Sequence, residues 1–364
     1  MISIIGAGPS GCFLAYELAK AGFEVHIFEE HKETGLPVQC TGLVTKELFD
    51  LIPLKKEFLV NKLDTVKVIA PNKQFAEIKV NEFLLDRSKF DQYLLKKAVN
   101  AGANIHFTHR FIDYNHQNKK VILKKDNKIK KINTNTLVGA DGPLSQVAKS
   151  AGIYGNRKFF IGMQAIVKAN FSKNTYKTFF GNIAPGFFAW IVPESSNQAR
   201  IGLATRQNTR QYFNNFLKGK GKVIALQSGI IPTYNKNQKV RKNNVYLTGD
   251  AATFCKATTG GGLVPGLKSA NILADCIINN KNYASSLKKV RHQLLMHNLI
   301  RSTLNRFSTS DYNKLIAYID TPKIASILYK HNRDSVLALI PKLLLAEPGF
   351  LYFSKCLFQK KKTF

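Results

Sequence analysis

The sequence predicts an α/β fold (α+β overall), in which a parallel sheet is interrupted by an antiparallel-sheet domain and followed by a helical region. The chain opens with an apolar strand, a glycine-rich turn and a helix, which together begin a βαβ unit. Residues 159–205 alternate in hydropathy and are rich in aromatic side chains, as is typical of an antiparallel sheet. A second strand, turn and helix at 244–279 resume the opening pattern, and the rest of the chain looks helical.

Each predicted element rests on its own local pattern. The helix at 87–100 carries an apolar stripe that includes Phe90 and Leu94, and a polar hairpin is expected to turn at Asp126-Asn127. The expected elements are strands at 2–5, 25–28, 103–107, 137–140 and 244–248, helices to about residue 20, at 87–100 and at 263–279, β-like runs at 65–70 and 75–80, and the hairpin at 119–132. The expected domains are a discontinuous first domain over 1–155 and 235–282, an antiparallel domain over 156–234 and a helical region over 283–364.

The glycine turn fits G-x-G-x-x-G and lies where a dinucleotide-binding motif must lie, directly after a strand and before a helix. Gly6 permits the tight turn, Gly8 lets the backbone approach a pyrophosphate, and Gly11 allows close packing of helix and strand. The N-terminus of the helix then offers free N–H groups to the phosphates. The alternative is a glycine turn in an ordinary βαβ unit.

An acid follows at the end of the second strand. Glu29 lies where a carboxylate can accept hydrogen bonds from both ribose hydroxyls, and Glu30 is the neighbouring alternative. An acidic residue at this point disfavours a 2′-phosphate on the ribose.

A second group of signals indicates FAD rather than NAD. Asp250 ends a buried strand and can hold a ribitol hydroxyl, and the triple glycine that ends at Gly262 opens a helix whose N–H groups can face a reduced flavin. Asp141 supplies a third strand-end Asp-Gly pair. A nicotinamide dehydrogenase would complete its nucleotide site within the first domain.

These motifs, in this order, resemble the Rossmann-type FAD-binding fold that aromatic-ring hydroxylases and geranylgeranyl reductases share. The segments 37–42 (PVQCTG), 86–91 (DRSKFD) and 185–193 (PGFFAWIVP) are similar to the P-V-x-C, D-R-x-x-F-D and P-x-x-Y-x-W-x-F-P motifs of the reductases. The nearest subgroup is the archaeal digeranylgeranylglycerophospholipid reductases. The resemblance covers roughly residues 1–280. Phe188 and Val192 depart from the Tyr and Phe of the last motif, which weakens the identity of the substrate more than the type of reaction.

The resemblance implies roles for individual residues. Gly11 and Glu29 would contact the adenosine half of FAD, and Phe111 would contact adenine through its backbone. The residues expected at the pyrophosphate, ribitol and ring are Cys40, Thr41, Leu43, Arg87, Asp250, Gly262 and Leu263. Phe188 and Trp190 would line the lipid pocket. Three of these residues have a plainer alternative: Trp190 as part of an aromatic core, Arg87 in an ion pair, and Cys40 as an inert small side chain.

The resemblance implies an FAD-dependent oxidoreductase that acts on CH–CH groups and saturates isoprenoid C=C bonds, on geranylgeranyl chains of archaeal-type glycerophospholipids. An isolated alkene is a poor hydride acceptor, so the enzyme must align it over the flavin and exclude water. We expect hydride transfer from flavin N5 to one carbon, and protonation of the other by Cys40 or an ordered water. A flavin monooxygenase is the alternative enzyme, and a basic membrane- or RNA-binding protein on a flavoprotein scaffold is the alternative from another class.

The amino-acid composition limits which binding partners and which cellular compartment are expected. The net charge is +31, but 43 Lys stand against only 11 Arg, and no recognition motif for nucleic acid is present, so no nucleic-acid partner is expected. The basic, apolar C-terminal region is either the solvated face of a helical bundle or a platform for a membrane surface. Five scattered cysteines and the lack of a signal peptide predict a cytoplasmic protein, peripheral at the membrane, and no metal site is expected. The electron donor stays open among ferredoxin, a deazaflavin and NADPH.

Overall fold

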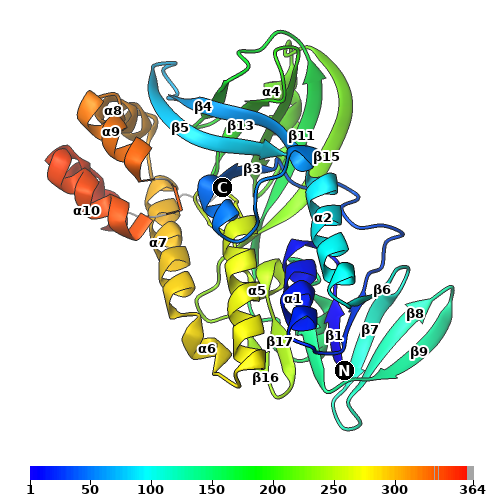
Figure 1. Cartoon of the computed structure of the whole chain (residues 1–364). Coiled ribbons are helices and arrows are strands. Elements are labelled where there is room, and N and C mark those ends of the chain that lie inside the picture. The colour runs from blue at the N-terminus through cyan, green and yellow to red at the C-terminus, as the bar shows by residue number, and fades with distance from the viewer. Residues whose placement is uncertain (332, 335, 359–364) are drawn as a thin grey trace. The chain divides into compact units, whose positions relative to one another are not determined.

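The computed structural model describes residues 1–331, 333–334 and 336–358. The chain divides into two compact units (Figure 1), and each is made from three separate segments of the sequence. Unit 1 comprises Met1–Val38, Arg87–Lys158 and Pro232–Leu294, and unit 2 comprises Gln39–Asp86, Phe159–Ile231 and Leu295–Phe364.

Unit 1 is built on a six-stranded sheet with the order β16-β17-β10-β1-β2-β6. The pairs from β17 to β6 are parallel, and only β16 runs antiparallel to its neighbour. The strands of this sheet are β1 (Ile2–Ile5), β2 (Val25–Phe28), β6 (Asn104–His106), β10 (Thr136–Gly139), β16 (Arg241–Lys242) and β17 (Val245–Leu247). Its helices are α1 (Pro9–Lys20), α2 (Arg87–Asn100), α3 (Gln146–Ser150), α5 (Leu263–Ile278) and α6 (Tyr283–Ser286), with the 3-10 helix η3 (Gly249–Ala252).

A separate three-stranded sheet in unit 1 contains β7 (Arg110–Asn115), β8 (Lys120–Lys125) and β9 (Lys128–Asn133). The turn from β8 to β9 lies at Asp126 and Asn127, whose φ angles are 47° and 63°. Two successive residues with positive φ are the geometry of a type I′ hairpin turn, which Asn and Asp tolerate. The predicted hairpin and its turn are therefore confirmed.

Unit 2 is built on an eight-stranded sheet with the order β15-β11-β14-β13-β12-β4-β5-β3. Its strands are β3 (Leu43–Thr45), β4 (Leu59–Ile69), β5 (Phe75–Leu85), β11 (Lys158–Lys168), β12 (Thr175–Phe179), β13 (Ala189–Pro193), β14 (Gln198–Thr205) and β15 (Lys222–Thr233). The helices that belong to it are η1 (Lys46–Asp50), η2 (Lys56–Phe58), α4 (Thr209–Leu217), α8 (Thr309–Ile319), α9 (Pro322–Lys330), α10 (Val336–Ala346), η4 (Pro348–Ser354) and α11 (Lys355–Phe358). Helix α7 (Lys288–Leu304) contains the boundary between the units.

The predicted fold class is confirmed, but the units differ from the predicted domain ranges. Residues 39–86, which the sequence analysis assigned to the nucleotide-binding domain, belong to unit 2 because β4 pairs with β12. That pairing is parallel, so the sheet is not purely antiparallel. The C-terminal region is helical as predicted, but residues 283–294 belong to unit 1 and the rest to unit 2.

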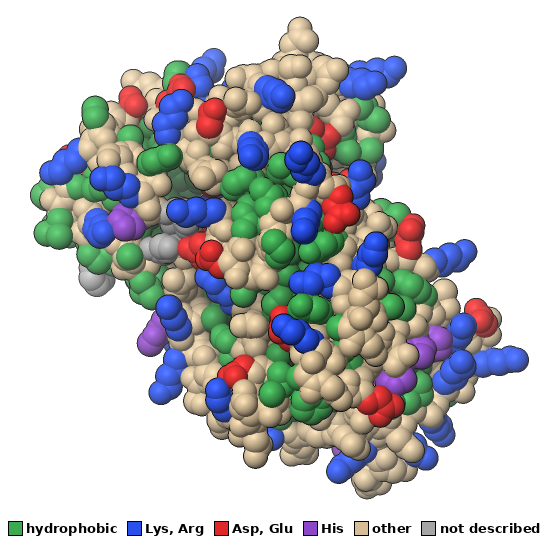
Figure 2. Space-filling view, viewed as in Figure 1, with side chains coloured by type: hydrophobic (Ala, Val, Ile, Leu, Met, Phe, Trp, Pro, Cys, Tyr) green, Lys and Arg blue, Asp and Glu red, His purple; other side chains and the backbone are tan. Residues whose placement is uncertain are grey.

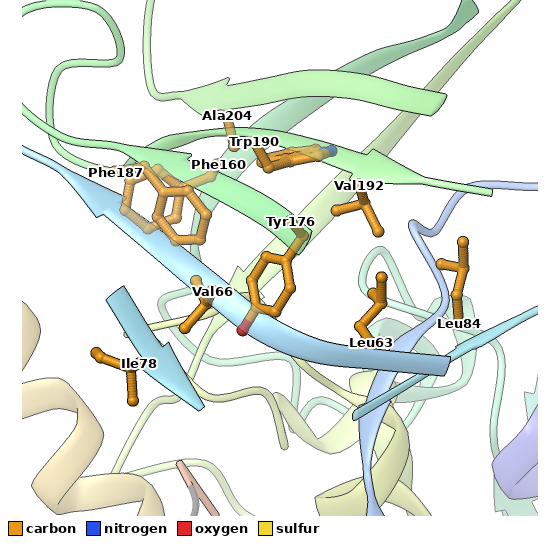
Figure 3. Close-up of a cluster of buried hydrophobic side chains, with 10 residues drawn as sticks. All are labelled: Leu63, Val66, Ile78, Leu84, Phe160, Tyr176, Phe187, Trp190, Val192 and Ala204. Carbon is orange, nitrogen blue, oxygen red and sulfur yellow. The ribbon is translucent and has the colours of Figure 1, made fainter. Parts of the chain in front are cut away.

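One core cluster of unit 2 consists of apolar side chains on the eight-stranded sheet (Figure 3). The cluster contains Leu63, Val66, Ile78, Leu84, Phe160, Tyr176, Phe187, Trp190, Val192 and Ala204. Ile319 of α8 and Leu328 of α9 pack against it. The C-terminal helices therefore cover apolar side chains that the sheet would otherwise expose.

Candidate cofactor-binding site

The glycine turn between β1 and α1 has the geometry that a pyrophosphate site requires. Gly6 has a φ of +101°, and a Cβ on it would lie 2.5 Å from the carbonyl oxygen of Ala140. A Cβ on Gly11 would lie 2.1 Å from the carbonyl oxygen of Gly6. A Cβ on Gly8 would meet nothing within 4 Å. Gly6 and Gly11 are thus required by packing within the chain, whereas Gly8 borders open space beside the N-terminus of α1, where phosphate would be accommodated.

Glu29 directly follows β2, is nearly buried and holds the glycine turn through a hydrogen bond. Its Oε2 accepts a hydrogen bond of 2.8 Å from the backbone N–H of Ala7. Its Oε1 accepts from the N–H of His31 at 3.0 Å and lies 2.6 Å from Nδ1 of the same histidine. Both oxygens of Glu29 are therefore occupied within the chain, and its contact with a ribose stays a prediction.

Asp250 lies in η3, directly after β17. Its carboxylate has no hydrogen-bond partner among the described residues, and a Cβ on Gly262 would lie 2.7 Å from its Oδ1. Burial raises the pKa of Asp250 to about 6, although the charges of Arg87 and Arg157 act in the opposite direction. A partly buried acceptor of this kind, close to the N-terminus of α5, suits a ribitol hydroxyl.

Arg157, which the sequence analysis did not single out, fixes the loops that follow two neighbouring strands. Its guanidinium donates to three backbone carbonyls, those of Tyr154 at 2.8 Å, Pro143 at 2.8 Å and Ala251 at 2.7 Å. Pro143 follows β10 and Ala251 follows Asp250, and the side chain is buried. This planar side chain thus joins the two strand ends at which the site is built.

Asp141 has a structural role. Its Oδ1 accepts from the hydroxyl of Ser145 at 2.6 Å, and its Oδ2 accepts from the N–H of Val147 at 3.0 Å. Ser145 in turn caps α3 through the N–H of Ala148. Burial raises the pKa of Asp141, and these hydrogen bonds oppose that effect. The third strand-end Asp therefore holds the start of a helix.

Other predicted residues of unit 1 are placed as follows. Arg87, at the start of α2, forms a bidentate ion pair with Asp91, with Nε–Oδ1 and Nη2–Oδ2 distances of 3.0 and 2.9 Å. The alternative interpretation of Arg87, an ion pair, is thus present in the structure, and its pyrophosphate contact stays a prediction. Phe111 is buried in β7, and Leu263 is the first residue of α5. Lys256, which belongs to no motif, is a buried lysine whose Nζ would lie 3.2 Å from a Cβ on Gly261.

The remaining predicted residues belong to unit 2. Cys40 is partly exposed, and its sulfur accepts a hydrogen bond of 3.3 Å from the N–H of Gly42. Thr41 donates to Gln164 at 2.8 Å, and Leu43 begins β3. Trp190 is buried in the apolar cluster and Phe188 packs at its edge, with ring centroids 5.8 Å apart. Trp190 is thus part of the core, as its alternative interpretation has it, and its contact with lipid stays a prediction.

The described residues contain no group of three or more His, Cys, Asp and Glu side chains that could hold a metal ion. The residues of unit 1 fit FAD instead. Gly8 leaves space for a pyrophosphate, Glu29 follows the second strand of the sheet, where a ribose is predicted to bind, and Asp250 presents an acceptor that the rest of the described chain does not use.

Residues 1–218 match the family described as FAD binding domain, and this chain belongs to that family. The protein is accordingly an FAD-dependent flavoprotein, as the sequence predicts. Its curated relatives include digeranylgeranylglycerophospholipid reductase 3 of Methanosphaera stadtmanae, 25% identical over 94% of this chain and 96% of that protein. The digeranylgeranylglycerophospholipid reductase of Methanococcus aeolicus is 27% identical over 89% and 93%.

Solved structures show the same fold. A geranylgeranyl bacteriochlorophyll reductase-like protein from Thermoplasma acidophilum superposes with a TM-score of 0.84, at 20% identity, over 98% of both chains. The flavin-dependent halogenase CmlS has a TM-score of 0.69 at 15% identity, over 94% of this chain and 76% of its own. The predicted resemblance to the geranylgeranyl reductase family, and an FAD-dependent oxidoreductase as the class of enzyme, are therefore confirmed.

Proposed function

We propose that this protein saturates C=C bonds of isoprenoid chains, with geranylgeranyl chains of archaeal-type glycerophospholipids as its substrates. The observation that carries the proposal is the likeness to digeranylgeranylglycerophospholipid reductases along almost the whole chain. Reduced FAD would supply the hydride.

The chain's own residues would align the alkene, exclude water and deliver a proton. Phe188 lies at the edge of the cluster and stacks on Phe187 at 4.5 Å between ring centroids, so it offers an apolar wall. Cys40 carries a free thiol that is partly exposed, and a thiol S–H can donate its proton. We assign to Cys40 the protonation of the second alkene carbon.

The decisive experiment is anaerobic. The purified protein is reduced with dithionite, a digeranylgeranyl glycerophospholipid is added, and flavin reoxidation is followed together with the mass of the lipid. The proposal requires reoxidation in step with a gain of two hydrogen atoms per saturated bond. Substrate-dependent oxygen consumption with NADPH in air, and no gain of hydrogen, would identify a monooxygenase instead. A Cys40→Ser variant that keeps FAD and the full rate of saturation would refute the role of the thiol.

We also propose that the C-terminal helices of unit 2 dock on an anionic membrane surface. No single helix among the described residues is long and apolar enough to cross a membrane. The segments Val336–Ala346 and Pro348–Leu357, which meet at a bend of 113°, together have the length and the apolar composition of a membrane span. Leu345 and Leu351 are 82% and 58% exposed on this pair. Lys and Arg side chains stand between apolar ones on the face shown in Figure 2. Lys342 and Lys355 are also exposed on these segments, and exposed leucines together with basic residues suit an interfacial position.

Docking is tested by co-sedimentation with vesicles that contain anionic phospholipid. A Leu345→Glu/Leu351→Glu variant should bind more weakly by roughly tenfold, because apolar area and positive charge both favour binding. Leu226→Glu is the matched control, since Leu226 is 65% exposed on β15, outside the helical region. Equal binding of wild type and the double variant would exclude these helices as the docking surface.

A further inference from the structure

The sheet of unit 2 brings one polar side chain into contact with a residue of the predicted substrate wall. Gly202 of β14 lies between Gln164 of β11 and Trp190 of β13, because it is paired with both. A Cβ on Gly202 would lie 2.6 Å from Cβ of Gln164 and 2.7 Å from Cε2 of Trp190. The missing side chain on the middle strand therefore allows the glutamine and the indole to meet across it.

The amide oxygen of Gln164 accepts two hydrogen bonds. One comes from Nε1 of Trp190 at 3.3 Å and the other from the hydroxyl of Thr41 at 2.8 Å. Since an indole N–H can only donate, the atom that faces it must be the amide oxygen. The amide nitrogen of Gln164 donates to Oε1 of Gln227, which fixes the orientation of the group from the other side.

The loop that contains Thr41 is also held through its backbone. Arg200 of β14 donates to the carbonyl oxygens of Thr41 and Leu85, and it is paired with Glu194 at 2.6 Å. Arg200 and its partner are almost buried. The side chain of Thr41 and its carbonyl are thus fixed by two different residues of the sheet, and Cys40 immediately precedes this anchored residue.

We propose that Gln164 is a positioning residue that holds the Cys40–Gly42 loop in a fixed relation to Trp190. The inference rests on the proposed function for its purpose, since that loop carries the assigned proton donor and Trp190 is predicted to line the lipid pocket. Gln164 is 4% exposed, so a loss of either donor would leave a buried amide oxygen with one fewer partner. The indole and the thiol loop would then be free to move independently.

The chain offers two probes that do not depend on turnover. Trp190 is the only tryptophan, so the intrinsic emission of the FAD-loaded protein reports on its indole. Cys40 is the one cysteine among the described residues that is not buried, so the rate of alkylation by iodoacetamide reports on the loop. The variants are Gln164→Met, which keeps the length of the side chain without the amide, Thr41→Val, which keeps its shape without the hydroxyl, and Thr41→Ser as the conservative rescue.

Gln164→Met should shift the emission of Trp190 and raise the alkylation rate of Cys40 severalfold. Thr41→Val should raise the alkylation rate similarly, and Thr41→Ser should restore the wild-type rate. The double variant Gln164→Met/Thr41→Val should alkylate no faster than the faster single variant, because both remove one shared interaction. Saturation of the lipid should slow by roughly tenfold in Gln164→Met.

An altered emission with an unchanged alkylation rate in Gln164→Met would overturn the inference, as would additive rates in the double variant. Failure of the proposed function has a different signature. If the wild-type protein saturates no lipid while the emission and alkylation results hold, the positioning role stands and the substrate is wrong.

Discussion

The hydroxyl of Thr41 and the indole Nε1 of Trp190 donate to the same oxygen atom, Oε1 of Gln164. The two donors come from segments that are far apart in the sequence, and both belong to unit 2. A residue predicted to contact the flavin and a residue predicted to contact the lipid are therefore held by one buried amide. A single hydrogen-bond acceptor therefore links the loop of Thr41 to the strand of Trp190.

Gly8 and Gly11 should respond to alanine in opposite ways. A Cβ at Gly11 would be only 2.1 Å from the carbonyl oxygen of Gly6, so Gly11→Ala should cost about 3 kcal/mol of folding free energy. A Cβ at Gly8 would have open space, so Gly8→Ala should leave the stability of the FAD-free protein nearly unchanged and weaken FAD binding by roughly tenfold or more. Denaturant unfolding and flavin titration separate the two effects. Equal losses of stability in both variants would contradict this assignment.

Asp250 should make the FAD-free protein more stable at mildly acidic pH. Its pKa is raised to about 6 by burial, so the folded state binds the proton more tightly than the unfolded chain does. The stability that this proton confers is lost as the pH rises from the ordinary aspartate range through about 6. Between pH 8 and pH 5, the wild type should gain about 1 kcal/mol relative to Asp250→Asn. Urea unfolding of both proteins at the two pH values tests the sign, and parallel pH profiles would refute it.

Arg157→Lys should destabilise unit 1 and weaken FAD binding. An ammonium group cannot reproduce the planar set of bonds to three carbonyls, and at least one of these would lose its partner. We expect a loss of about 3 kcal/mol in unfolding free energy. Arg110→Lys is the control, because the pair of Arg110 with Glu30 is exposed and 3.7 Å long. Similar stabilities for the two variants would show that Arg157 does not hold the loops.

Gly202→Ala should disturb the sheet of unit 2 at Trp190. The added methyl would lie 2.6 Å from the carbonyl oxygen of Met163 as well as against Gln164 and the indole. We expect a loss of about 2 kcal/mol in stability and a shift of the tryptophan emission. Gly162→Ala on β11 is the matched control, since its nearest neighbour would be a side-chain carbon of Ile231 at 3.3 Å. A normal emission spectrum for Gly202→Ala would contradict the close packing of Gln164 and Trp190.

Local patterns in the sequence were sufficient for most of unit 1. Helix α2 has the predicted bounds, and α1 and α5 end at or within one residue of the predicted ends, because a stripe of apolar residues is a property of neighbouring positions. The partner of β4 could not be predicted in this way. Its parallel pairing with β12 depends on a contact between distant segments, and it moves residues 39–86 into the other unit.

The sequence predicts site residues that belong to motifs, and it gives no signal for residues that act outside any motif. Asp141 and Asp250 look alike in the sequence, but Ser145 four residues after Asp141 is the signal of a helix cap. Arg157 and Gln164 belong to no motif. In a chain with 43 Lys, each of the 11 Arg is itself a signal, and Arg157 and Arg200 are both buried and bound to backbone carbonyls. The roles predicted for individual residues at the flavin and the lipid remain to be tested by the variants above.

The interleaving of the two units governs how the chain can fold during synthesis. One edge of β4 has no partner until β12 has left the ribosome, and β12 ends at Phe179. In the same way, one edge of β10 stays unpaired until β17 has been synthesised. Long-range pairings of this kind form slowly and leave strand edges exposed to other chains. Truncated or stalled products should therefore aggregate, and production at low temperature or with chaperones should raise the yield of native protein.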